Sequence, residues 1–303
     1  MGKGAPQILC CINFSESKQS SPIGRTKGPG DNFLMSHPSG STSAVPLRLN
    51  RDSLYVLAFY IVVIAITCLF TWEIARSQMP YILPREHFLE RFDWLLLGMF
   101  ITFVGTSLLG TEVKSDAFTL IAGSFGGLLI ESWGTNTGLW GYFTGEKPPW
   151  WIVAPWGASA VCIDRLQRAL VRLPPFERAS DRAITVAYWV SMAAYSVVLL
   201  RFVGPALFAW PTLAILALTY YVVLRLRAPR TTLSLIAAGT LLGYFMEYWG
   251  TSRACWTYYD GSIPPAMPVI GHGVASVGFW RLSQFLRVTC APKAASAIFR
   301  ERA

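Results

Sequence analysis

The sequence has little charge for its length. Only 14% of its 303 residues are Asp, Glu, Lys or Arg, against about 25% in soluble proteins, whereas 53% are hydrophobic. The charge is missing from long apolar segments rather than thinned evenly along the chain. This composition argues against a soluble enzyme, a nucleic-acid-binding module or a disordered chain. It predicts a polytopic integral membrane protein of the all-α class.

The chain also lacks the cysteine and histidine spacings of disulfide frameworks and zinc sites. None of its six cysteines forms a Cys-x-x-Cys pair, and its three histidines include no His-x-x-x-His pair. Two of the cysteines, Cys68 and Cys162, lie inside apolar segments. We therefore expect neither a bound metal nor a cofactor.

Eight apolar segments each approach the roughly 20 residues that a helix needs to cross hydrocarbon. Glycines in the third segment and a Pro-Pro-Trp-Trp run at the fourth are compatible with short, broken or partly re-entrant helices there. Met35 offers an alternative start, in which case 1–34 would not be translated. The eight segments are 53–72, 93–111, 117–133, 150–168, 183–202, 205–225, 231–249 and 266–287.

The excess of basic residues predicts how the chain is oriented. The net charge is +9, and most of the 26 Lys and Arg residues fall on the side of the two termini when sides alternate between segments. By the positive-inside rule both termini then face the cytoplasm, and a bacterial inner membrane is the expected location. The segments 133–149 and 249–265 would lie at the outer face. We read the charge as orientation, expect no nucleic-acid partner, and leave the oligomeric state open.

Two parts of the sequence repeat each other. Residues 123–135 align without a gap with 239–251, and the match continues through paired Trp, Tyr, Gly and Pro residues to Gly157 and Gly273. The chain is therefore predicted to contain two four-helix repeats. The expected organisation is a disordered segment at 1–50, a first repeat at 51–172, a second repeat at 183–287 and a cytoplasmic tail at 288–303.

The repeated motif places one glutamate at the same position of each repeat. An even number of spans per repeat makes the repeats parallel and relates them by a pseudo-two-fold axis along the membrane normal, so Glu131 and Glu247 should lie at the same depth. Each follows two glycines on one helical stripe, which lets another helix approach and points the carboxyl into the bundle. An acid inside the membrane is by default expected to be functional. In the alternative, each Glu only fixes a helix end, by accepting hydrogen bonds from Trp133, Trp249 or loop amides.

Aromatic residues crowd the segment that follows each glutamate. Ring faces stabilise a developing cation, although aromatic belts at membrane interfaces would look the same in sequence. The second repeat has His272 where the first has Trp156, and Asp260 where the first has Thr144. We take Glu131, Glu247 and His272 as candidate catalytic residues, although a lone histidine is more often structural. The candidate substrate-binding residues are Trp133, Trp140, Tyr142, Trp156, Trp249, Trp256, Tyr258 and Asp260.

The order of residues in the first repeat resembles a known family. The residues that carry the resemblance are Glu131, Gly134, Thr137, Gly138, Tyr142, Gly145, Pro148, Pro155 and Trp156. They are similar to a motif of the membrane-embedded carotenoid biosynthesis family, which includes carotenoid hydratases of the bisanhydrobacterioruberin hydratase type. The resemblance implies an isoprenoid or other hydrophobic lipid substrate, protonated at a terminal double bond by Glu131 or Glu247. Capture of the resulting cation by water would make the protein a hydratase, and capture by an internal alkene would make it a cyclase.

Two other classes of function fit the same sequence. Repeated halves with intramembrane acids also suit a transporter or a lipid-handling protein without catalysis. The loops that contain Glu-Trp-Gly-Thr could instead serve as docking surfaces in a membrane complex. A carrier would move its substrate without changing the mass of that substrate, whereas an enzyme would change it.

Overall fold

The computed structural model describes residues 47–70, 76 and 93–290, and the described part is mostly helical, as the composition predicts. The predicted disordered segment and tail, and the alternative start at Met35, lie almost entirely outside these residues. The described helices are α1 (Arg51–Phe70), α4 (Trp94–Leu108), α5 (Val113–Asn136), α6 (Val153–Leu170), α7 (Pro174–Glu177), α8 (Asp181–Phe202), α9 (Trp210–Leu224), α10 (Pro229–Ser252) and α11 (Ala266–Cys290).

All of these helices except the short α7 coincide with the predicted apolar segments. Two of them, α5 and α8, are long and apolar enough to cross a membrane, and α4 and α9 are shorter apolar helices. The break considered for the third segment is absent, because α5 runs without interruption. The fourth segment does begin irregularly, with a 3-10 turn at Trp150–Ile152 ahead of α6.

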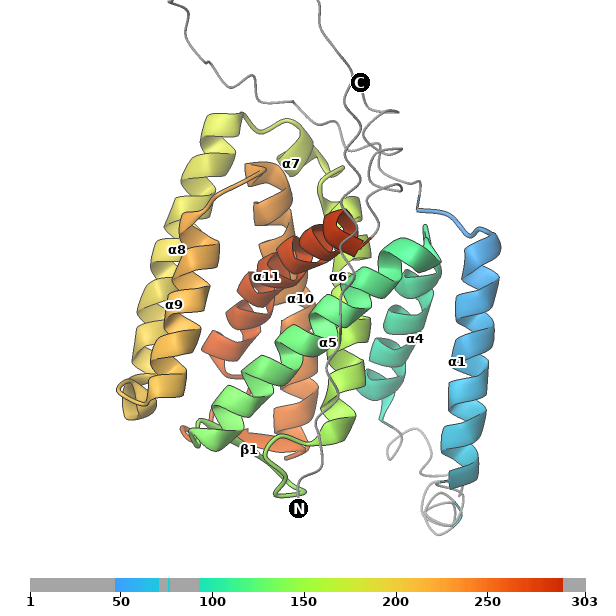
Figure 1. Cartoon of the computed structure of the whole chain (residues 1–303), viewed down its shortest axis with the longest axis horizontal. Helices are drawn as coiled ribbons and strands as arrows, with labels where there is room; N and C mark the ends of the chain where they lie inside the picture. Colours follow the sequence, from blue (N-terminus) through green and yellow to red (C-terminus); the bar gives the residue numbers. More distant parts are fainter. Residues whose placement is uncertain (1–46, 71–75, 77–92, 291–303) are drawn as a thin grey trace, which may run out of the picture. The chain divides into compact units, whose positions relative to one another are not determined.

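Four helices make the centre of the bundle (Figure 1). Helix α5 packs against α6, α10 packs against α11, and the two pairs also contact each other, α5 with α11 and α6 with α10. Glycines make these contacts close: a Cβ on Gly127 would lie 2.1 Å from Cγ of Trp156, and one on Gly243 would lie 2.7 Å from Cβ of His272. The glycine stripe seen in the sequence therefore brings each glutamate-bearing helix directly against its partner helix.

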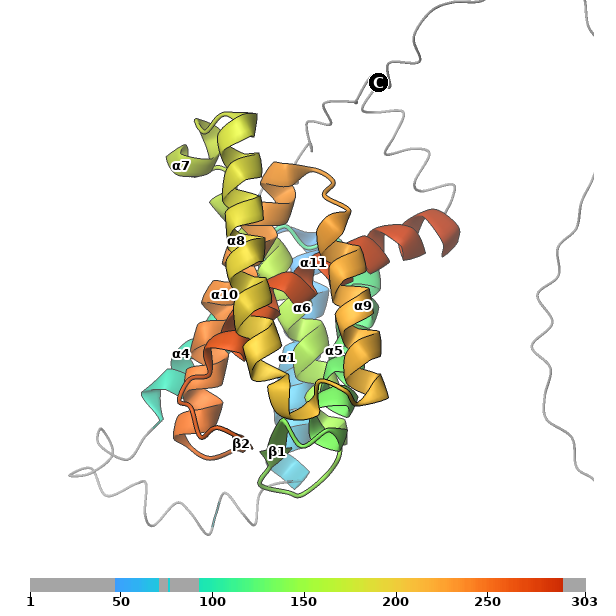
Figure 2. The ribbon, with the colours of Figure 1, turned by 90° about the vertical axis from the view of Figure 1, so that its left-hand side faces the viewer.

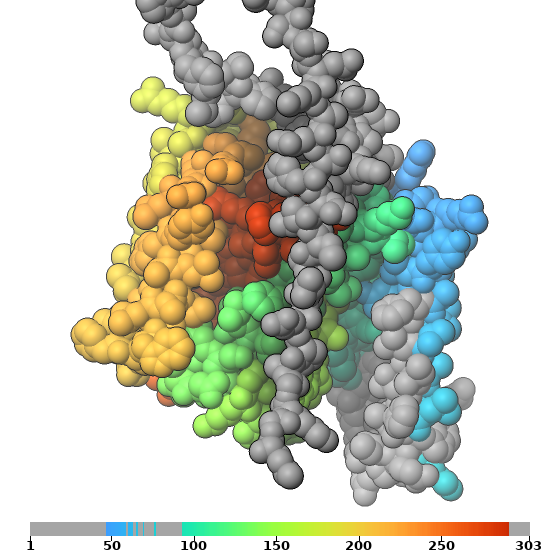
Figure 3. All heavy atoms as spheres, viewed as in Figure 1, coloured from blue at the N-terminus to red at the C-terminus, as the bar shows by residue number. Residues whose placement is uncertain are grey.

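The remaining helices flank this centre on two sides. Helices α8 and α9 contact α11, and α8 also contacts α10, whereas α4 contacts α6 and α1 packs on α4. Figure 3 shows atoms of α9, α11 and α5 adjoining one another on one face. The central helices thus carry the buried side chains on which the site depends.

Two short strands join the loops that follow α5 and α10 (Figure 2). Strands β1 (Trp140–Tyr142) and β2 (Trp256–Tyr258) pair antiparallel, with Gly141 opposite Thr257 at the centre of the register. The two segments aligned by the repeat therefore pair with each other about a local two-fold. Both loops also share a left-handed glycine, Gly145 with φ of 72° and Gly261 with φ of 67°. This pairing brings the two aromatic segments of the chain together.

Candidate functional site

Glu131 lies in the last turns of α5 with only 5% of its surface exposed. Its two carboxylate oxygens accept one indole hydrogen bond each, Oε2 from Nε1 of Trp140 at 2.9 Å and Oε1 from Nε1 of Trp156 at 3.0 Å. The ring of Trp140 reaches the carboxylate by lying over Gly134, where a Cβ would come within 1.9 Å of it. Strand β1, through Trp140, and helix α6, through Trp156, are thereby anchored to one carboxylate.

Glu247 occupies the equivalent position on α10 and is equally buried. Its Oε2 accepts hydrogen bonds from Nε1 of Trp256 at 2.9 Å and from the hydroxyl of Tyr258 at 3.0 Å. Its Oε1 lies 3.2 Å from Nε2 of His272. Each glutamate thus accepts a hydrogen bond from the equivalent indole of its own repeat, Trp140 or Trp256. The other carboxylate oxygen faces Trp156 in the first repeat and His272 in the second.

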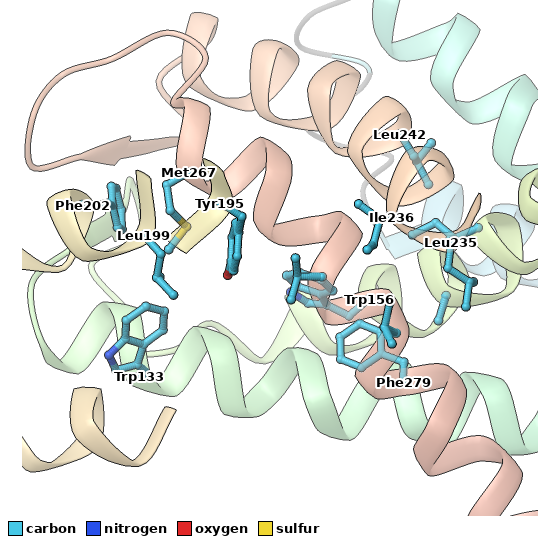
Figure 4. Packing of buried hydrophobic residues seen from close by; sticks show 14 of the residues in the cluster. Trp133, Trp156, Tyr195, Leu199, Phe202, Leu235, Ile236, Leu242, Met267 and Phe279 are labelled. Carbon is cyan, nitrogen blue, oxygen red and sulfur yellow. The ribbon is translucent and has the colours of Figure 1, made fainter. Parts of the chain in front are cut away.

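The two carboxylate sites touch through a ring stack at the centre of the bundle. The indole of Trp156 and the imidazole of His272 are stacked, with centroids 4.7 Å apart and planes inclined by 15°. The rings of Phe279 and Trp156 form a T-shaped contact with centroids 5.8 Å apart, and Figure 4 shows these two rings together. Across the sheet, Trp140 lies 5.7 Å from Tyr258 and Tyr142 lies 5.9 Å from Trp256. The site is therefore one continuous aromatic cluster with two carboxyl groups inside it.

Hydrogen-bond chemistry separates the two glutamates. An indole nitrogen can only donate, so both oxygens of Glu131 accept from their indole partners. An imidazole nitrogen can donate or accept, depending on the tautomer. Oε1 of Glu247 therefore faces a nitrogen that can accept or donate a proton, Nε2 of His272. The two indoles that bind Glu131 cannot accept a proton, and its further hydrogen-bond partner is the hydroxyl of Tyr142.

The two tyrosines of the sheet stay protonated in this environment. Burial raises the pKa of the Tyr142 phenol, and the charge of Glu131 raises it further. Burial also raises the pKa of Tyr258 well above its usual value, with Glu247 as the next cause. Tyr258 therefore acts as a hydrogen-bond donor to the carboxyl group.

The structure places three of the predicted substrate-binding residues away from the carboxylates. The indole of Trp133 donates to Oγ1 of Thr212 at 3.0 Å, and that of Trp249 donates to Oδ2 of Asp93 at 2.8 Å. The alternative in which these two indoles hold the glutamates is therefore wrong, because both rings turn outward to flanking helices. Asp260 lies exposed in its turn and accepts from the amide and hydroxyl of Ser262.

Sequence reasoning missed a polar clamp beside the site. Asp93, the N-cap of α4, accepts from Nε of Arg253 at 2.7 Å and from its Nη2 at 3.0 Å, as well as from Trp249. The Arg253 hydrogen bond lowers the pKa of Asp93 from 3.8 to about 2. The only signal in the sequence is an aspartate directly before an apolar segment, which predicts a helix cap and not its partner.

The two glutamates, His272 and the surrounding aromatic side chains determine the chemistry that the site can perform. Within the described residues, no group of three or more His, Cys, Asp or Glu side chains could hold a metal ion. A comparison with protein-family models, with curated proteins and with solved structures finds no match for this chain. The arrangement offers one contact between two ionisable side chains, Glu247 and His272, enclosed by aromatic rings.

Proposed function

We propose that this protein is an integral membrane enzyme that protonates a carbon–carbon double bond of an isoprenoid or similar polyene lipid. Glu247 is the acid, and His272 is the residue that shares its proton. The observation that carries the proposal is the 3.2 Å contact between Oε1 of Glu247 and Nε2 of His272, with both side chains buried among aromatic rings. A carboxylic acid positioned in an apolar site can transfer its proton to an alkene bound beside it.

The proposed reaction consumes no net proton, because the proton that Glu247 gives to the alkene is replaced when the product forms. The π electrons of the alkene take the proton from Oε1 of Glu247, which forms a C–H bond and leaves a tertiary cation. The faces of Trp156 and Trp256 stabilise this cation through their quadrupoles. In hydration, a lone pair of water forms the C–O bond and the released proton returns to Glu247. In cyclisation, an internal double bond attacks instead, and loss of a neighbouring proton completes the cycle.

Glu131 has a structural role in this proposal. Its carboxylate accepts an indole N–H at each oxygen and so holds Trp140 and Trp156 against α5. Trp156 in turn packs against His272 through the ring stack. The two repeats have thus diverged, the first towards a fixed support and the second towards an ionisable pair.

The membrane setting extends the same proposal. We infer that the eight long helices cross the bilayer as two parallel four-helix repeats, with the sheet at the outer face and the termini in the cytoplasm. The apolar helices α5 and α8 support it. So do arginines at helix ends opposite the sheet, namely Arg168 in the last turn of α6, Arg225 at the C-cap of α9 and Arg230 near the start of α10. This orientation follows the positive-inside rule.

Extraction of lipids and pigments from cells with and without the protein tests the activity. The host should make a linear polyene, and the extracts should be compared by mass. We expect a product heavier by one water, or an isomer of equal mass with a different retention time. If the protein instead moves labelled polyene across vesicles and leaves all masses and retention times unchanged, it is a carrier and the enzymatic proposal fails.

A further inference from the structure

An arginine that both repeats contain has different partners in each. Arg165 on α6 is buried and binds two carboxylates, Oδ2 of Asp116 at 2.5 Å and Oδ2 of Asp164 at 2.6 Å. The gapless alignment of the repeats pairs Arg165 with Arg281 on α11. The same alignment places a threonine and a tryptophan where the first repeat has the two aspartates. The second repeat therefore keeps the cation and lacks both of its counter-charges.

Arg281 binds the C-terminal end of α9 instead of a carboxylate. Its Nη1 donates to the carbonyl oxygen of Val222 and its Nη2 to that of Arg225, both at 2.5 Å. The last carbonyls of a helix lack partners within the helix, and together they carry about half an elementary negative charge. The end of α9 thus fixes the position of the Arg281 guanidinium and leaves much of its positive charge uncompensated.

Two exposed arginines add to the positive charge at the same place. The guanidinium of Arg225 lies over the ring of Tyr221, 4.4 Å from its centroid. Arg227 is close enough for its charge to act on Arg281. Among the described residues, no carboxylate forms an ion pair with Arg225, Arg227 or Arg281. These three residues, the arginine cluster, therefore concentrate positive charge where the chain offers no counter-charge of its own.

Exposed apolar side chains adjoin the arginine cluster. Leu224 directly precedes Arg225 at the end of α9, and Phe285 and Val288 are exposed on α11. Because residues four and seven positions apart share one face of a helix, Phe285 and Val288 continue the stripe that Arg281 begins. The end of α9 lies opposite the sheet (Figure 1). Positive charge next to exposed apolar surface matches the two parts of a phospholipid, an anionic headgroup and its acyl chains.

We propose that the arginine cluster binds the headgroup phosphate of an anionic phospholipid in the cytoplasmic leaflet. Arg225 and Arg227 supply N–H donors to the phosphate, Arg281 adds a fixed positive charge, and the acyl chains lie against the exposed apolar side chains of α9 and α11. The choice of leaflet rests on the membrane orientation proposed above. Lipid binding does not depend on the proposed reaction, so the two proposals can fail separately.

Native mass spectrometry of the full chain, released from detergent micelles, tests this site. Phosphatidylglycerol and phosphatidylcholine with the same acyl chains should be titrated separately, and we expect the wild type to bind phosphatidylglycerol more tightly. In Arg225→Gln/Arg227→Gln the affinity for phosphatidylglycerol should fall about tenfold or more. This variant should keep its fold, because both replaced residues are exposed and Arg281 binds the main-chain carbonyl of Arg225 rather than its side chain.

Arg178→Gln/Arg182→Gln is the matched control. It removes two exposed arginines from the same end of the bundle and should bind phosphatidylglycerol as the wild type does. An equal loss of affinity in both double variants would show that binding follows net charge and would overturn the site. Equal binding of the two lipids by the wild type would overturn it as well. If inorganic phosphate binds the wild type as tightly as phosphatidylglycerol does, the ligand is a free anion and the assignment to a lipid fails.

Discussion

Replacing each glutamate by glutamine should affect stability unequally, although the two residues occupy equivalent positions of the repeat. In Glu131→Gln the new amide has one oxygen for two indole N–H donors, from Trp140 and Trp156. Its NH₂ group therefore faces a second donor, and a buried donor left without an acceptor costs about 1–3 kcal/mol. In Glu247→Gln the amide oxygen still accepts from Trp256, and the NH₂ donates to Nε2 of His272. That replacement should cost less than about 1 kcal/mol, because every group keeps a partner.

Equilibrium unfolding in mixed micelles would measure this difference. The double variant Glu131→Gln/Trp140→Phe should lose less stability than the sum of its single variants, because it removes the unmatched N–H together with its lost acceptor. Trp133→Phe provides the control, since its indole donates to Thr212 and not to a glutamate. Equal losses for Glu131→Gln and Glu247→Gln, or a larger loss for the latter, would refute the assignment of a shared proton to one glutamate alone.

Two further predictions concern the surroundings of the site. Gly134→Ala should destabilise the protein by about 1–3 kcal/mol, because the added methyl group would displace the buried ring of Trp140. Gly141→Ala is the control and should be close to neutral in the same unfolding assay, because nothing lies within 4 Å of its Cβ. The Arg253 hydrogen bond lowers the pKa of Asp93 from 3.8 to about 2, so its stabilisation is complete above pH 3.8 and is lost as the pH falls towards 2. Arg253→Ala should flatten the dependence of stability on pH in that window by at most about 1 kcal/mol, because the pair is partly exposed; an undiminished slope would show that another group is responsible.

The positions of the helices could be predicted from the sequence because apolar length and periodicity are local properties. The same holds for the contact between glutamate-bearing and partner helices, since glycines four residues apart on one stripe permit close approach in any context. The break that the glycines of the third segment allowed is absent from α5 for a related reason. Its glycines serve packing against α6, and a helix keeps its hydrogen bonds through glycine when tertiary contacts compensate for the lost propensity.

The partners of the buried side chains could not be predicted in the same way. The indoles two residues and nine residues beyond each glutamate are indistinguishable in sequence, yet Trp140 turns inward to Glu131 and Trp133 turns outward to Thr212. That choice depends on the path of the loop and on the pairing of β1 with β2, which joins segments far apart in the chain. The alignment did single out His272 as one position where the repeats differ, and the structure places it against Glu247.

Product formation by the two glutamine variants tests the central claim most directly. Glu247→Gln and Glu131→Gln should be expressed at matched levels in a host that makes the linear polyene, and the products should be quantified by mass and retention time. We predict that Glu247→Gln abolishes the product, whereas Glu131→Gln retains it in proportion to the folded protein present. Full product formation by Glu247→Gln, or its loss only in Glu131→Gln, would contradict the assignment of Glu247 as the acid.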